Sequence, residues 1–142
     1  MKLLISTKVN QNYKKVFLSF DKLMFEKITP GKRFFTLKKF QGTKPGHRFV
    51  ILFPFNQKWK GIITEKKETP DYCYFTDEGI TLPFGLAQWR HRHWIIKENN
   101  STSIITEDIH FKGRSVVLSY LIYPMIWLFM FARKGKYKSF FN

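Results

Sequence analysis

The stretch Val116–Ala132, VVLSYLIYPMIWLFMFA, decides how the rest of the chain is interpreted. It holds seventeen residues without a charge, and basic side chains flank it at Arg114, Arg133 and Lys134. This length is at the lower limit for a membrane-spanning helix and above that of an ordinary buried segment. The stretch is therefore either a membrane anchor or the last helix of a soluble domain, apolar almost all round because both of its faces are covered.

The region before this stretch predicts an antiparallel meander. Runs of β-favouring residues alternate there with turn sequences such as Glu68-Thr69-Pro70-Asp71 and Asn99-Asn100-Ser101. Connections this short pair strands antiparallel, because parallel neighbours need a long crossover. Strands are expected at 33–40, 47–55, 58–67, 72–77, 87–97 and 102–111.

The N-terminal segment predicts one more strand and then helix. Leu3–Val9 alternates apolar and polar residues, which is typical of a strand. Asn10 and Asn12 can cap a helix that follows, and apolar residues recur at helical spacing as far as Lys27. One or two short helices are expected between Gln11 and Lys27.

The predicted order is strand, short helices, meander and long helix, an α+β fold in a single domain over residues 1–142. A curved sheet of six to seven strands has a concave apolar face that needs cover. Ser115 to about Ser139 is the segment long and apolar enough to provide it, and Tyr137, Phe140 and Phe141 continue its apolar spacing beyond the basic cluster. These features favour a core helix that forms one wall of a pocket, with the anchor as the alternative.

Composition limits the class of partner. The chain has 142 residues, a net charge of +15 and 18% aromatic residues, sixteen of them Phe. So many rings fill a core or line an apolar cavity, and the charge favours an anionic head group or peripheral contact with an anionic membrane. Nucleic acid is not favoured, because no RNA-recognition pattern accompanies the basic residues. A lone cysteine, Cys73, and the absence of a signal peptide favour the cytoplasm; the oligomeric state stays open.

The most informative run is LPFGLAQWRHRHWII, Leu82 to Ile96. A strand from Ala87 onward would place alternate residues on opposite faces: Trp89, His91, His93 and Ile95 on one, and Arg90, Arg92 and Trp94 on the other. The facing strand divides likewise, with Thr106, Asp108 and His110 in one set and Ile105, Glu107 and Ile109 in the other.

Imidazoles and a carboxylate are therefore expected to share one face. Three interpretations remain open: an internal hydrogen-bonded cluster, acid–base chemistry, or a metal site whose third ligand would be His110, Asp108 or Glu107. The first is favoured, and no metal is predicted. The sequence contains no Walker loop, dinucleotide glycine run or hydrolase motif, so no cofactor or catalytic set is predicted either.

These residues resemble a bacterial subgroup of the SRPBCC superfamily, the START-like and polyketide-cyclase-like helix-grip proteins. Its members read F-x-D, then G-P-F-x-x-W-x-H-x-H-x-F, then T-x-x-x-D-x-[IV]-x-[FY], and close on F-x-x-R-x-x-x-L-x-x-x-F. The matching residues are Phe75, Asp77, Pro83, Phe84, Trp89, His91, His93, Asp108, Ile109, Phe111 and Arg133, with Thr106 slightly out of register and Tyr137 replacing Leu. Leu82 replaces a glycine, and two extra residues precede Trp89, which affects the loop rather than the strand.

The resemblance implies a helix-grip fold with a cavity between sheet and C-terminal helix. Superfamily members bind lipids, sterols, polyketides or other apolar molecules, and some are cyclases or hydratases. We therefore expect the chain to bind a hydrophobic or amphipathic small molecule, with a cyclase- or hydratase-type enzyme or a membrane-associated protein as alternatives. The predicted ligand-binding residues are Trp89, His91, His93, Asp108, His110, Trp59, Phe53, Tyr120 and Trp127.

Overall fold

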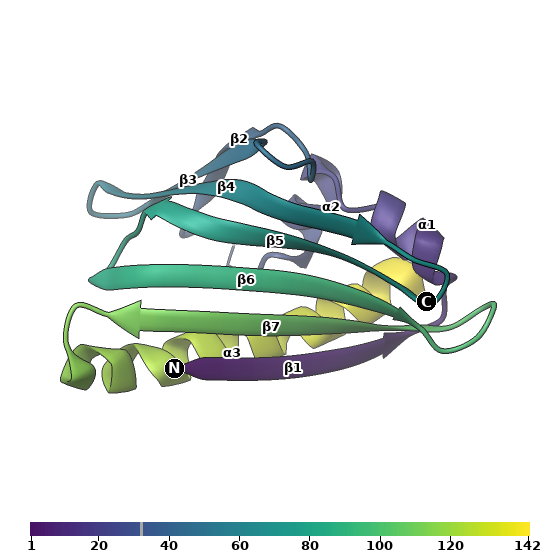
Figure 1. Cartoon of the computed structure of the whole chain (residues 1–142). Helices are drawn as coiled ribbons and strands as arrows, with labels where there is room; N and C mark the ends of the chain where they lie inside the picture. Colours follow the sequence, from purple (N-terminus) through teal and green to yellow (C-terminus); the bar gives the residue numbers. More distant parts are fainter. Residues whose placement is uncertain (32) are drawn as a thin grey trace.

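The computed structural model describes residues 1–31 and 33–142, and its elements follow the predicted order (Figure 1). They are β1 (Lys2–Val9), α1 (Tyr13–Leu18), α2 (Lys22–Ile28), β2 (Thr36–Phe40), β3 (Arg48–Phe53), β4 (Gln57–Glu68), β5 (Tyr72–Thr81), β6 (Leu86–Lys97), β7 (Ser103–Gly113) and α3 (Val116–Phe141). Side-chain caps start the helices: Asn12 accepts from Lys14 N at α1, Asp21 from Met24 N at α2, and Ser115 from Leu118 N at α3.

The strands form one antiparallel sheet in the order β1-β7-β6-β5-β4-β3-β2, which confirms the helix-grip prediction. The sheet curves, and α3 runs along its concave side (Figure 1). β5 continues past the predicted end at Asp77 as far as Thr81. Glu78 pairs with residues on both β4 and β6, and Gly79 pairs with a residue on β4. Pairing with neighbours outweighs the low strand preference of glycine there.

α3 covers the sheet with only part of its surface. Ile122, Met130 and Tyr137 are buried and contribute to the core beside β1 and β7. The expectation that both faces of this helix are covered is wrong. α3 is long and apolar enough to cross a membrane, with a mean hydropathy of 1.6 over an 18-residue window. Only 22% of that window is buried, however. A helix packed on one sheet buries one stripe, and here the opposite stripe is apolar too.

Candidate ligand-binding site

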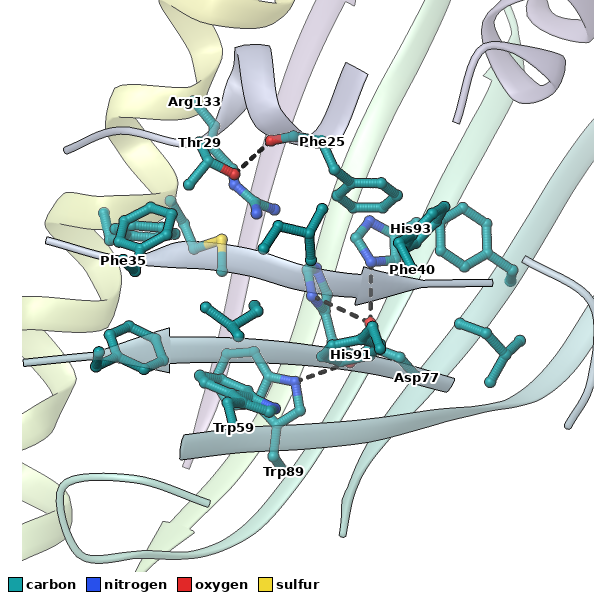
Figure 2. A pocket seen from close by; sticks show the side chains of 18 residues that line it. Phe25, Thr29, Phe35, Phe40, Trp59, Asp77, Trp89, His91, His93 and Arg133 are labelled. Carbon is teal, nitrogen blue, oxygen red and sulfur yellow. Dashed lines mark hydrogen bonds and ion pairs between the residues drawn. The ribbon is translucent and has the colours of Figure 1, made fainter. Parts of the chain in front are cut away.

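A pocket lies between the sheet and α3, and aromatic and aliphatic side chains make up most of its lining (Figure 2). Asp77, His91, His93 and Arg133 supply its charged and imidazole groups. Its volume is about 110 Å³. Ligand sites in proteins have this composition: mostly apolar walls with a few convergent polar groups.

β6 carries the polar residues into the interior. Trp89, His91, His93 and Ile95 alternate along its inner face, each at most 5% exposed. Trp89 belongs to one apolar cluster of the core and Ile95 to the other, so the two imidazoles lie where the clusters meet. The prediction that these four residues share one face of the strand is confirmed.

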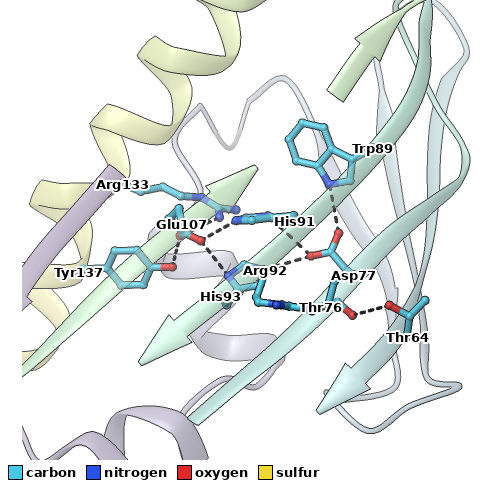
Figure 3. A network of polar contacts seen from close by, with 10 residues as sticks. All are labelled: Thr64, Thr76, Asp77, Trp89, His91, Arg92, His93, Glu107, Arg133 and Tyr137. Carbon is cyan, nitrogen blue, oxygen red and sulfur yellow. Dashed lines mark hydrogen bonds and ion pairs between the residues drawn. The ribbon is translucent and has the colours of Figure 1, made fainter. Parts of the chain in front are cut away.

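Glu107 on β7 is the centre of the buried polar cluster (Figure 3). Its Oε2 lies 2.6 Å from His91 Nε2 and 2.9 Å from His93 Nδ1. Its Oε1 accepts a hydrogen bond from Tyr137 at 2.5 Å and one from Arg133 at 3.5 Å, both on α3. One carboxylate, only 2% exposed, thereby connects β6, β7 and α3.

Asp77 on β5 closes the cluster on the other side of the imidazoles. Its Oδ2 lies 3.1 Å from His93 Nε2 and 3.6 Å from His91 Nδ1. Its Oδ1 accepts a hydrogen bond from Trp89 Nε1 at 3.2 Å. Both imidazoles therefore lie between the two carboxylates, but only His93 is within hydrogen-bonding distance of both, because His91 Nδ1 is 3.6 Å from Asp77.

These contacts give the two imidazoles different protonation behaviour. Burial lowers the pKa of His91, and the charge of His93 lowers it further. Burial acts in the same direction on His93, but Glu107 and Asp77 outweigh it and raise the pKa. Burial would raise the pKa of Glu107, yet the His93 and His91 contacts hold it well below its usual range. The surroundings therefore favour the neutral form of His91, and they favour a His93 imidazolium paired with ionised Glu107.

Apart from His93 Nδ1, which has Glu107 at 2.9 Å, two donors at the pocket have no partner within residues 1–31 and 33–142. Arg133 Nε and Trp59 Nε1 are buried and make no hydrogen bond there, although both residues line the pocket. A buried N–H group without a partner costs about 1–3 kcal/mol. These donors are suited to an oxygen acceptor on a bound molecule.

The same cluster contains a set of possible metal-binding atoms. Asp77, His91 and His93 each offer a ligand atom, all within 4.8 Å of one another. Two imidazole nitrogens and a carboxylate oxygen are a donor set that zinc accepts, and Glu107 could orient both rings from the outer side. The third ligand would be Asp77, not His110, Asp108 or Glu107 as the sequence suggested. Hydrogen bonds from a protonated His93 to Asp77 and Glu107 account for the same geometry, so we assign no metal.

Five of the predicted site residues line the pocket: Trp89, His91, His93, Trp59 and Phe53. Asp108 and His110 do not, and their placement beside the imidazoles is wrong. In the strand register Asp108 lies opposite Arg92 and His110 lies opposite Arg90. These side chains are on the outer face of the sheet, where His110 is exposed. Adjacent strand residues alternate between faces, so Glu107 takes the inner position.

Tyr120 and Trp127 also lie outside the pocket, which corrects their prediction as lining residues. Tyr120 is 67% exposed and Trp127 is 41% exposed, with its ring stacked on Phe131. Both lie on the side of α3 that faces away from the sheet. Phe129, Met130 and Arg133, roughly one turn further along α3, line the pocket instead.

Sequence reasoning missed four members of the cluster: Asp77, Glu107, Arg133 and Tyr137. In the sequence, Asp77 and Arg133 match motif positions and Tyr137 replaces a motif leucine. Glu107 enters the sequence prediction only as one of three possible third metal ligands. The signal that could have identified Glu107 is the hairpin register, because Glu107 pairs directly with His93.

No protein-family model matches the sequence, and no curated protein matches it either. Solved structures share its fold at low identity. Norcoclaurine synthase from Thalictrum flavum, in complex with dopamine and hydroxybenzaldehyde, aligns over 95% of this chain and 84% of its own, with a TM-score of 0.67 and 8% identity. Protein Ms6760 from Mycobacterium smegmatis aligns over 99% and 90%, with a TM-score of 0.71 and 14% identity.

A third similar structure is the di-domain ARO/CYC protein BexL from the BE-7585A biosynthetic pathway. It aligns over 98% of this chain and 45% of its own, with a TM-score of 0.72 and 11% identity. At these identities the likenesses establish the fold. The finer resemblance to the W-x-H-x-H subgroup stays a prediction.

Proposed function

Because the chain has the helix-grip fold of the SRPBCC superfamily, we propose that it binds a small aromatic molecule that carries an oxygen acceptor. The ligand lies in the pocket between the sheet and α3. Its ring contacts the aromatic lining, and its oxygen faces the polar end formed by Asp77, His91 and Arg133.

The size of the pocket supports a ring rather than a long chain. The pocket volume of about 110 Å³ is of the same order as the cavity of about 150 Å³ that holds benzene, so a single ring would fill it completely. A lipid with a long acyl chain would need the walls to separate. The expected ligand is therefore a compact molecule.

The observation that carries the proposal is the pair of unpartnered donors, Arg133 Nε and Trp59 Nε1. In a purely structural core such groups would be paired. A carbonyl, phenol or carboxylate oxygen within the pocket would give them an acceptor. Norcoclaurine synthase, with the same fold, was solved with a hydroxybenzaldehyde, a molecule of this kind.

We expect hydroxybenzaldehyde to bind about tenfold more tightly than ethylbenzene, since two additional hydrogen bonds contribute about 0.5–1.5 kcal/mol each. Titrations followed by tryptophan fluorescence or by amide NMR shifts measure both affinities. Trp59→Phe keeps a ring but removes one donor, so this variant should reduce the difference. Equal affinities of the wild type for both compounds would contradict the proposal.

A second candidate is proton transfer, supported by His91. Its pKa is lowered, and Nδ1 makes no hydrogen bond to any described residue. A neutral imidazole at a pocket wall can take a proton from a carbon next to a bound carbonyl, leaving an enolate, and then return it. We expect the protein to exchange the α-protons of phenylacetaldehyde in deuterated water, and His91→Asn to lose the exchange while keeping binding. Unchanged exchange in this variant would exclude the role.

A further inference from the structure

The outer face of α3 carries eight exposed large apolar side chains: Val116, Val117, Tyr120, Leu121, Met125, Trp127, Leu128 and Phe131. Their exposed fractions run from 41% at Trp127 to 70% at Val116. Together they present roughly 800 Å², above the few hundred Å² of a typical apolar surface patch. A patch of this size indicates an interaction surface.

The polarity of this helix changes along its length. Up to Ala132, the exposed positions of α3 other than Ser115 at its cap are apolar. Beyond Arg133 the exposed positions become polar or basic, among them Lys136 and Lys138. A helix whose outer positions faced only water would show polar residues throughout.

Basic residues flank the outer face of α3, and acidic residues are missing from the helix. Lys112 and Arg114 are exposed just before it, and Lys134 lies 5.6 Å from the Phe131 ring. The sequence Val116–Phe141 contains no Asp or Glu, in a chain of net charge +15. An apolar face bordered by cations is the composition of helices that lie in the interface of an anionic membrane.

A further exposed aromatic residue lies in a turn at the same end of the molecule. Phe55, at the β3–β4 turn, is 91% exposed although its φ is 60°, a backbone region that favours glycine or asparagine. Packing within the protein does not account for an aromatic residue there. The turn lies at the end of the molecule where α3 begins (Figure 1).

We propose that the outer face of α3 docks the protein onto an anionic membrane surface. The apolar side chains enter the boundary between head groups and acyl chains, with Tyr120 and Trp127 at the level that such rings prefer. Lys136 and Lys138 contact lipid phosphates. This surface goes beyond the proposed ligand binding, since none of its residues lines the pocket.

Two other occupants are disfavoured by features of the chain. A spanning helix would have to leave the sheet, which would separate buried Arg133 and Tyr137 from Glu107. A second copy of the chain would bring two proteins of charge +15 together at faces bordered by lysines. A membrane rich in anionic lipid instead supplies the complementary charge.

Vesicle co-sedimentation tests this proposal. We expect the wild type to bind vesicles of phosphatidylcholine mixed with phosphatidylglycerol, and to bind phosphatidylcholine alone at least tenfold more weakly. The double variant Leu121→Glu and Met125→Glu should lose at least 100-fold, because each side chain loses its burial and gains a repelled charge. Lys136→Gln with Lys138→Gln should lose about 25-fold on anionic vesicles only, at roughly fivefold for each lysine.

The matched control is Leu18→Glu with Leu23→Glu, which changes two exposed leucines on α1 and α2. This control should bind vesicles like the wild type, and circular dichroism should show every variant folded. Absence of wild-type binding, or equal loss in the control, would overturn the proposal. So would a wild-type dimer, seen by light scattering, that Leu121→Glu with Met125→Glu converts to a monomer without any vesicle binding.

Discussion

Replacing Glu107 by Gln is expected to lower the free energy of unfolding by about 3–5 kcal/mol, the usual cost of breaking a buried ion pair on one side. The amide oxygen can still accept from Tyr137, but the amide nitrogen cannot accept from His91 or His93. His93 and Arg133 would then be buried with one carboxylate fewer. Urea denaturation followed by tryptophan fluorescence measures the change.

The control for this variant is Glu78→Gln on the outer face of β5. Glu78 pairs with Arg90 at 3.6 Å, and its side chain is 45% exposed. An exposed pair of this kind contributes little, so the expected change is under about 1 kcal/mol. Similar losses in the two variants would show that Glu107 does not hold the cluster together.

Acidification gives the Glu107 prediction a second measurement. The folded-state pKa of Glu107 is held well below its usual value, so its stabilisation is fully present above the unfolded value of about 4.3. That stabilisation is lost as the pH falls through the folded-state pKa. The stability gap between wild type and Glu107→Gln should therefore narrow in acid. A gap that stays constant at low pH would contradict an ionised Glu107.

The residues that share one face of β6 could be predicted from sequence because strand alternation depends on one strand alone. Trp89, His91 and His93 share a face wherever the strand begins or ends. The facing residues on β7 depend instead on the register between two strands. A shift of one residue exchanges Glu107 with Asp108, so alternation within single strands does not determine which carboxylate faces the imidazoles.

The hairpin itself contained the information needed to choose Glu107. Lys97 pairs with Ser103, which leaves Asn100 at the centre of the connection. Residues equally distant from Asn100 then face each other, and His93 and Glu107 are such a pair. The Asn-Asn-Ser turn predicted from sequence has the same centre, so counting outward from it would have placed Glu107 correctly.

Asp77, Arg133 and Tyr137 could not be assigned to the cluster by local pattern. Each lies in a segment that supports the family resemblance, but they come from β5 and α3. Their meeting at the imidazoles depends on how α3 crosses the sheet, which periodicity does not determine. Likewise, the sequence predicted that α3 covers the sheet, but not how much of the helix would stay uncovered.

Replacing Ile51 by Trp is expected to weaken hydroxybenzaldehyde binding about 1,000-fold. Ile51 lies on β3 opposite Trp59, and both line the pocket. An indole added there would occupy the space proposed for the ring of the ligand. Excluding an aromatic ring forfeits about 150 Å² of apolar burial, or about 4 kcal/mol at roughly 25 cal/mol per Å². The fluorescence or NMR titration described above measures the loss.

Val50→Trp is the matched control, because Val50 is the next residue on the same strand and pairs with Lys60 on the opposite face of the sheet. Val50→Trp adds a similar ring without entering the pocket, so its affinity should match that of the wild type. Overpacking costs about 1–3 kcal/mol of stability, and thermal unfolding of both variants separates that cost from the loss of binding. If Ile51→Trp stays folded and binds hydroxybenzaldehyde as the wild type does, the ligand site is not this pocket.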